Sequence, residues 1–259
     1  MTATPRALRH SLIIPAYNEE AYLPRLLDTV DRARARYRGG PDAVEVIVAD
    51  NLSSDGTAPL AVDRGCRVVP VEKRVIGAVR NAGARAARGE IVCFVDADHQ
   101  IHPETFNEID RVLTDRVVGG TTGIRFERRS PGIACTYAML MLIGMAMRGV
   151  RHRRDLSVDT GVVFCRRDDF AAMGGYRENV MFAEDVRLLL DLRKLGRRKG
   201  QRVTRGTDAP SVFSTRKFDT WGDWHYFTVP LRIGWDLLRG RGNTARRYWY
   251  DVRSQPRAP

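Results

Sequence analysis

Two aspartates one residue apart, Asp96 and Asp98, follow an apolar run at residues 90–95. The run is typical of a buried strand, and strands of an open parallel sheet present functional groups at their carboxyl ends. Carboxylate oxygens are the ligands that Mg²⁺ and Mn²⁺ prefer, and such an ion can neutralise the charge of a departing diphosphate. The pair therefore predicts a divalent-metal site at a strand end. An acidic turn without a metal is the ordinary alternative.

The elements that must position this pair are indicated by strand-like and helix-like patterns that alternate through the first half of the chain. This alternation favours an α/β fold with parallel strands. Apolar residues recur at helical spacing from Leu23 to Val30, residues 51–57 open a further helix, and Gly196 is expected to end a helix at 184–195. The expected strands lie at 11–16, 44–49, 66–71, 90–95, 117–126 and 158–165, and the other expected helices at 76–87, 133–147, 168–173 and 221–238, with disorder beyond.

Four segments carry polar residues in a fixed order along the chain. They read Ile-Ile-Pro-Ala-Tyr-Asn-Glu-Glu at 13–20, Val-Ala-Asp-Asn-Leu-Ser-Ser-Asp-Gly-Thr at 48–57, Val-Arg-Asn-Ala-Gly at 79–83 followed by the aspartate pair, and Gly-Val-Val-Phe-Cys at 161–165 followed by Gly-Gly-Tyr at 174–176 and Ala-Glu-Asp at 183–185. Together they resemble glycosyltransferase family 2, the inverting nucleotide-sugar transferases with a GT-A fold. The resemblance covers about residues 10–215.

The resemblance implies a mostly parallel central sheet with helices on both faces and a C-terminal helical tail. Residues 1–215 are expected to form the GT-A domain, and residues 216–259 a basic, aromatic-rich helical extension and tail. It also implies a nucleotide-diphosphate sugar as donor, with UDP favoured over GDP by the habit of the family.

A nucleotide site is implied where the first two strands end side by side. Tyr17 offers an aromatic face for stacking a base, worth about 0.5–1.5 kcal/mol beyond area burial. Asp50 is suited to accept a base N–H, and Glu19 to bind ribose hydroxyls. The alternative is purely structural: Tyr17 and Glu19 would mark the end of a strand and a charged first turn of the next helix. The expected nucleotide-sugar site comprises Pro15, Ala16, Tyr17, Asn18, Glu19, Asp50, Arg80, Asp96, Ala97 and Asp98.

Within this site the resemblance implies that Asp98 binds Mg²⁺ or Mn²⁺ directly. Asp96 is expected to reach the ribose, or the metal through a water molecule. Arg80 stands where the family has a cation near the nucleotide and its diphosphate, although a solvent-facing helix arginine is the alternative. His99 and His102 flank the pair and could tune it.

Inversion by direct displacement needs one base on the far side of the anomeric carbon. The resemblance assigns this role to Asp185, and like-charge repulsion from the adjacent Glu184 is expected to raise the pKa of Asp185. Both residues also fit the first turn of a helix, where the helix dipole favours acids. In some GT-A enzymes a histidine late in the chain binds the metal, but His225 is more readily explained as an ordinary packed or exposed histidine.

The composition bounds the partners and the cellular location. The chain has 259 residues, a formal net charge of +12 and four scattered cysteines, which favours free thiols in a reducing compartment. The apolar stretch at 133–147 is shorter than the roughly 20 residues of a membrane span. Its basic flanks suit an anionic membrane surface, with solvated helix faces as the alternative. No nucleic-acid motif accompanies the charge, so no nucleic acid is expected.

These features predict a cytoplasmic enzyme, with a peripheral position at the inner membrane face as a further expectation. The enzyme is expected to add a single sugar to an acceptor that the sequence leaves unidentified, with a lipid-linked acceptor suggested by the apolar and basic segments. The Gln-x-x-Arg-Trp element of processive polysaccharide synthases is absent after Asp185. A sugar-nucleotide pyrophosphorylase, a non-catalytic nucleotide-sugar or membrane-surface binding module, and a retaining GT-A enzyme are the alternatives.

Overall fold

The computed structural model describes residues 7–149, 161–179, 184–225 and 227–228. Its centre is a seven-stranded sheet in the order β3-β2-β1-β4-β6-β5-β7. The strands are β1 (His10–Ala16), β2 (Val44–Asp50), β3 (Arg67–Pro70), β4 (Ile91–Phe94), β5 (Val117–Phe126), β6 (Val163–Arg166) and β7 (Arg202–Phe213). Among these strands, only β6 runs antiparallel to its neighbours β4 and β5. The expected α/β architecture with a mostly parallel sheet is confirmed.

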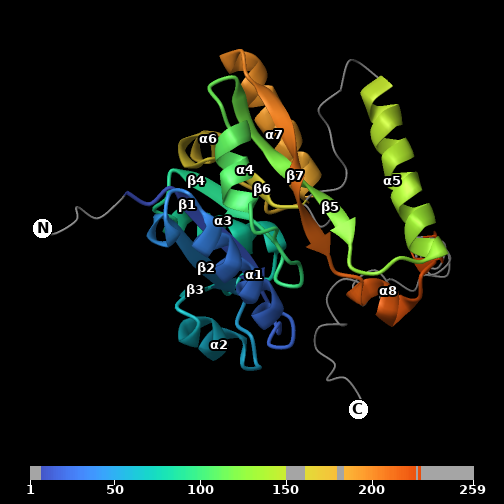
Figure 1. Ribbon diagram of the computed structural model, residues 1–259, viewed down its shortest axis with the longest axis horizontal. Coiled ribbons are helices and arrows are strands. Elements are labelled where there is room, and N and C mark those ends of the chain that lie inside the picture. Colours follow the sequence, from blue (N-terminus) through green and yellow to red (C-terminus); the bar gives the residue numbers. More distant parts are fainter. Residues whose placement is uncertain (1–6, 150–160, 180–183, 226, 229–259) are drawn as a thin grey trace, which may run out of the picture.

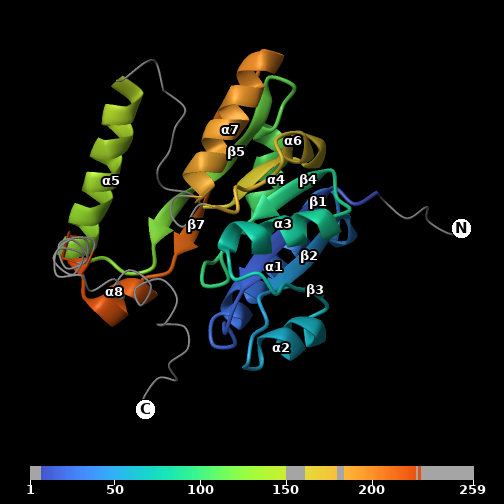
Figure 2. The same cartoon turned by 180° about the vertical axis from the view of Figure 1, so that it is seen from behind.

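Helices cover both faces of the sheet (Figure 1 and Figure 2). Alternation along β1 assigns the faces, because Leu12 and Ile14 pack in a cluster with α1 and α4, whereas Ile13 packs with α3, α6 and α7. The helices are α1 (Leu23–Arg36), α2 (Thr57–Asp63), α3 (Ile76–Ala86), α4 (Thr105–Val112), α5 (Pro131–Gly149), α6 (Arg167–Ala172), α7 (Glu184–Lys199) and α8 (Arg216–Trp221), with a 3₁₀ turn at Pro41–Ala43.

The carboxyl ends of β1, β2 and β4 meet at one edge of the sheet. Ala16 is paired with Asp50, and Ile13 with Phe94, so β1 extends beyond the last residue of β4. Pro15 lies in this overhang, where β4 offers no further ladder partner and a missing N–H is tolerated. The loops that leave the three strands therefore start side by side, as the sequence predicted.

Expectations about the second half of the chain need correction, and one strand there was not predicted. Gly196 does not end α7, because the helix continues to Lys199 and ends before Gly200, whose φ is 69°. A Cβ at Gly196 would lie 2.8 Å from the carbonyl oxygen of Gln201, so this glycine serves close packing. The sequence did not predict β7, an edge strand that contains Pro210, a residue that edge strands accommodate.

The helix expected at 221–238 does not begin at residue 221, although His225, Phe227 and Thr228 within that range are helical. Helix α8 ends at Trp221, and Gly222 follows with a φ of 85°. Residues beyond 228 lie outside the described part, as do residues 150–160, which include the start of the strand expected at 158–165. The described strand there, β6, begins at Val163.

Helix α5 stands apart from the sheet and approaches α8 with its N-terminal end (Figure 1 and Figure 2). This end is tightly packed, because a Cβ at Gly132 would lie 2.6 Å from the carbonyl oxygen of Asp223. Phe126, at the end of β5, contacts Phe218 of α8 with their ring centroids 6.0 Å apart. No helix in the described residues has the length and apolar character needed to span a membrane.

Candidate active site

The loops after β1 and β2 are joined by hydrogen bonds. Asn18, with a φ of 53°, donates its backbone N–H to Ser53 Oγ (3.0 Å), and its side-chain oxygen accepts from the N–H of Ser54 (2.8 Å). Asparagine tolerates this left-handed conformation better than most residues. Glu20 accepts from the N–H of Gly56 in the same way (2.9 Å). The predicted site residue Asn18 therefore holds the two loops together.

Tyr17 and Asp50 lie at these adjacent strand ends, and each has a neighbour that the sequence reasoning missed. The Asp50 carboxylate is buried and accepts from both the hydroxyl (2.5 Å) and the N–H (3.1 Å) of Ser53. The Arg74 guanidinium lies over the Tyr17 ring, 4.9 Å from its centroid. One face of the ring is thus occupied by a cation, while Ala16, in β1, is buried beside it.

Arg80 connects the aspartate pair to the predicted base. Its guanidinium donates to Asp96 Oδ1 (2.7 Å) and to Asp185 Oδ1 (2.5 Å), and it lies 3.4 Å from Glu184 Oε1. The side chain is 3% exposed, so the alternative of a solvent-facing helix arginine is wrong. Burial alone lowers the pKa of Arg80, but the surrounding negative groups, Asp185 first, outweigh it and raise this pKa well above its ordinary value.

Residues of the Gly-Gly-Tyr motif, at 174–176, contact both Arg80 and Asp185. Tyr176 donates its hydroxyl to Asp185 (2.8 Å), and the Arg80 guanidinium lies 5.1 Å from the centroid of its ring. Asn81 accepts from the backbone N–H of Tyr176 (2.8 Å) and donates to its carbonyl (2.9 Å). Gly175 is required here, because a Cβ would lie 2.5 Å from Asn81 Oδ1 and the φ is +72°. Two motifs far apart in sequence therefore form one unit.

The environment of Glu184 changes its titration. Burial raises the pKa of Glu184, the nearby Arg80 lowers it, and Asp185 raises it again, with a net increase. Repulsion from Asp185 thus contributes to the raised pKa of Glu184, behind the larger contribution of burial.

A second arginine, Arg216 of α8, binds the remaining acids. It donates to Glu19 Oε2 (2.7 Å) and lies 2.9 Å from Asp98 Oδ2. Glu19 is 2% exposed, so its carboxylate faces Arg216 within the protein. No local pattern marked Arg216, which lies more than a hundred residues after its partner Asp98. Burial lowers the pKa of Arg216, but Asp98 and Glu19 raise it above its ordinary range overall.

The acidic residues fit a divalent cation. One ligand atom each from Asp96, Asp98 and His99 lies within 4.8 Å of the others. His99 is buried, and its Nδ1 has no hydrogen-bond partner within the described residues. The two carboxylates suit Mg²⁺ or Mn²⁺, and the imidazole is compatible with a transition metal. The buried Ala97 between the aspartates adds no ligand atom.

The other two candidate histidines lie elsewhere in the described structure. His102 accepts at Nδ1 from the backbone N–H of Glu104 (3.2 Å), before α4. His225 is buried with Nδ1 2.8 Å from the carbonyl oxygen of Gly222, and its ring packs on Phe218. Neither belongs to the metal-ligating group found among the described residues, where His99 is the histidine.

Known proteins share both the sequence motifs and the fold of this chain. The model of the family described as "Glycosyl transferase family 2" matches residues 11–174. The mannosyltransferase PcManGT from Pyrobaculum calidifontis, solved with GDP-Man and Mn²⁺, superposes with a TM-score of 0.60 at 19% identity, covering 100% of this chain and 67% of that one. Glucosyl-3-phosphoglycerate synthase from Mycobacterium tuberculosis, solved with Mn²⁺, UDP and glucosyl-3-phosphoglycerate, gives 0.59 at 20% identity, covering 86% and 78%.

Among curated relatives, an undecaprenyl-phosphate 4-deoxy-4-formamido-L-arabinose transferase of Pseudomonas paraeruginosa is 42% identical over 117 residues, which cover 42% of this chain and 32% of that protein. The fold is the GT-A fold of glycosyltransferases. The chain belongs to glycosyl transferase family 2. It matches only about a third of the length of such curated relatives, between 30% and 39% for three of them.

Proposed function

We propose that this glycosyltransferase moves one sugar from a nucleoside-diphosphate sugar, UDP-sugar by preference, to an acceptor by direct displacement with inversion. The acceptor oxygen forms a bond to the anomeric carbon while the bond from that carbon to the diphosphate breaks. Asp185 takes the proton of an acceptor hydroxyl. The base stacks on Tyr17, with Asp50 and Glu19 toward the nucleoside.

One observation carries this proposal: the Arg80 guanidinium contacts both Asp96 and Asp185, at 2.7 and 2.5 Å. The aspartate pair and the proposed base therefore lie within the span of a single guanidinium, as a reaction between a diphosphate sugar and an acceptor requires. A divalent cation at Asp96 and Asp98 would supply positive charge to the leaving diphosphate. Arg80 and Tyr176 orient the Asp185 carboxylate through two hydrogen bonds to Oδ1.

We propose a lipid-linked acceptor and a peripheral position at the cytoplasmic membrane face. Support comes from the apolar helix α5, from the four arginines between positions 148 and 154, and from the relative that acts on undecaprenyl phosphate. The acceptor chemistry decides how much Asp185 contributes. A hydroxyl acceptor needs a base, whereas a phosphate acceptor is already ionised at pH 7 and does not.

The test measures release of the nucleoside diphosphate from a series of nucleotide sugars with Mn²⁺, using undecaprenyl phosphate and a lipid-linked glycan with a free hydroxyl as acceptors. With a hydroxyl acceptor, Asp185→Asn should lower kcat by about 10²–10⁴-fold while UDP binding persists. Asp191→Asn on the same helix is the matched control, because Asp191 pairs with Arg177 at 2.8 Å on the outside. Unchanged turnover in D185N with the hydroxyl acceptor would exclude the proposed base.

Two further measurements test the finer parts of the proposal. Product NMR should show inversion of the anomeric centre; retention would point to a different mechanism on the same fold. Flotation with vesicles of anionic lipid should carry the protein upward, and failure to float would remove the membrane-surface part.

A further inference from the structure

We propose that Arg216 is a positioning residue that competes with the divalent cation for Asp98, so that binding of the metal loosens helix α8. This inference rests on the metal-assisted function proposed above, and it adds a residue outside the sequence motifs. It is carried by the contacts of a single, largely buried guanidinium.

The guanidinium of Arg216 joins three elements of the site. Its Nη1 donates to Glu19 Oε2 at 2.7 Å, while its Nη2 lies 3.3 Å from Glu19 Oε1 and 2.9 Å from Asp98 Oδ2. The ring of Tyr22 lies against it, with 4.6 Å between the guanidinium carbon and the ring centroid. The side chain is 13% exposed. This fork therefore ties the start of α8 to the loops after β1 and β4.

A cation at the aspartate pair would place a second positive charge beside Arg216. Asp98 offers two oxygens, of which Oδ2 is paired with Arg216 and Oδ1 lies 3.8 Å from His99 Nε2. A divalent ion bound to the same carboxylate would be a like charge within a few ångströms of a largely buried guanidinium. This repulsion favours displacement of Arg216 from Asp98, leaving the pairing with Glu19.

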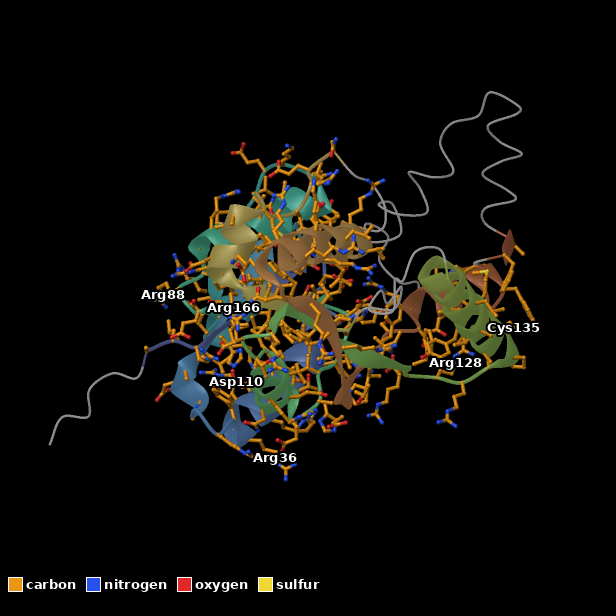
Figure 3. The ribbon with its side chains drawn as sticks, turned by 90° about the horizontal axis from the view of Figure 1, so that it is seen from above. Arg36, Arg88, Asp110, Arg128, Cys135 and Arg166 are labelled. Carbon is orange, nitrogen blue, oxygen red and sulfur yellow. The ribbon has the colours of Figure 1, made fainter. Side chains whose placement is uncertain are left out.

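Helix α8 connects the displacement of Arg216 to the N-terminal end of α5. Arg128, just before α5, pairs with Asp219 of α8 (3.1 Å) and with Asp223 (2.6 Å). Figure 3 shows Arg128 beside α5, on the far side of the molecule from Arg88. A shift of α8 therefore acts directly on the contacts that hold the apolar helix proposed to face the acceptor.

The first experiment measures Mn²⁺ affinity by electron paramagnetic resonance without nucleotide. Arg216→Gln should bind Mn²⁺ about tenfold more tightly or better, because the competing charge is removed. Arg128→Gln is the matched control: it removes one positive charge beside α8, but its ion pairs do not include Asp98. Arg216→Lys retains the charge without the fork and should give a smaller increase; it keeps the test valid if R216Q does not fold.

The second experiment follows hydrogen exchange of the amides in residues 216–221 when Mg²⁺ is added. Exchange should become faster in the wild type, whereas R216Q should exchange fast already and should not respond to Mg²⁺. A purely structural role for Arg216 would not produce this dependence on the metal.

The outcomes separate the two proposals. If Asp98→Asn abolishes Mn²⁺ binding but R216Q and R216K bind like the wild type, the metal site stands and the competition is refuted. If R216Q is no tighter than R128Q, the effect is general electrostatics and the inference also fails. If neither the wild type nor R216Q binds Mn²⁺, with or without UDP, the metal-assisted function itself is refuted, and this inference with it.

Discussion

Removal of the Arg80 guanidinium should destabilise the fold far more than removal of any exposed arginine on the same helix. Arg80→Met keeps most of the side-chain length but leaves Asp96, Glu184 and Asp185 without their shared partner. The Arg80 side chain is 3% exposed, while those of Glu184 and Asp185 are 20% and 19% exposed. The two acids on α7 are thus held in a poorly solvated place by one cation.

The size of the effect follows from this burial. Removing one partner of a buried ion pair costs about 3–5 kcal/mol, since the other charge remains buried. Asp96 is 41% exposed and can be solvated, so the loss should lie near the lower end, about 3 kcal/mol. For a chain of this length, that corresponds to a decrease in Tm of about 6–12 °C.

The pH dependence gives a second, independent check. Burial raises the pKa of Glu184 and Arg80 lowers it, so without Arg80 the folded-state pKa of Glu184 should lie further above that of the unfolded chain. An acid whose pKa is raised by folding destabilises the fold when ionised and ceases to do so once it is protonated. The loss of unfolding free energy in R80M should therefore be largest at pH 7. It should shrink as the pH falls toward 4.5, the ordinary pKa of Glu184.

Urea unfolding followed by circular dichroism at several pH values measures both effects. Arg85→Met, an exposed position on the same helix, is the control and should change the unfolding free energy little. The reasoning is refuted if R80M is no less stable than R85M, or if its deficit stays constant on acidification.

Three further predictions concern the same architecture. Glu184→Gln should stabilise the protein at pH 7, because the raised pKa of Glu184 means that folding disfavours its ionised form, and the gain should vanish in urea titrations below pH 4.5. Gly175→Ala should lower the unfolding free energy by about 1–3 kcal/mol, more than Gly174→Ala, since only the former Cβ would meet Asn81; equal losses would contradict this. Cys135 is the exposed thiol and the other three cysteines are buried, so a thiol reagent should label one group per native chain, and C135S should abolish that labelling.

The sequence predicted those parts of the fold that local pattern determines. The strand expected at 117–126 coincides with β5, and the strand expected at 11–16 differs from β1 by one residue. All seven residues of β1 and the first seven of β5 are buried, as expected of strands that are covered on both faces of the sheet. The convergence of β1, β2 and β4 was also predictable, because parallel neighbours end at the same edge.

What the sequence did not predict depends on partners far along the chain. Strand β7 has a mixed polar pattern, and it becomes a strand through its pairing with β5 at the sheet edge. Arg74 and Arg216 look like ordinary members of a chain with 43 basic residues. Their roles appear only when folding brings them to Tyr17 and Asp98.

Arg80 and Arg216 differ in how many ion pairs they keep if their aspartate, Asp96 or Asp98, binds a cation instead. Arg80 contacts Asp96 and, besides it, Glu184, Asp185 and the Tyr176 ring, so it stays paired if Asp96 leaves. Arg216 pairs with two carboxylates within the described residues, those of Glu19 and Asp98, and loses one of them.

Occupation of the proposed metal site should therefore leave α3 and the proposed base Asp185 in place while it changes the anchoring of α8. We expect the surroundings of Arg80 to stay unchanged and the contacts between α8 and α5 to respond to the cation. Arg80→Met should therefore lower kcat and stability together. Arg216→Gln should above all alter metal affinity.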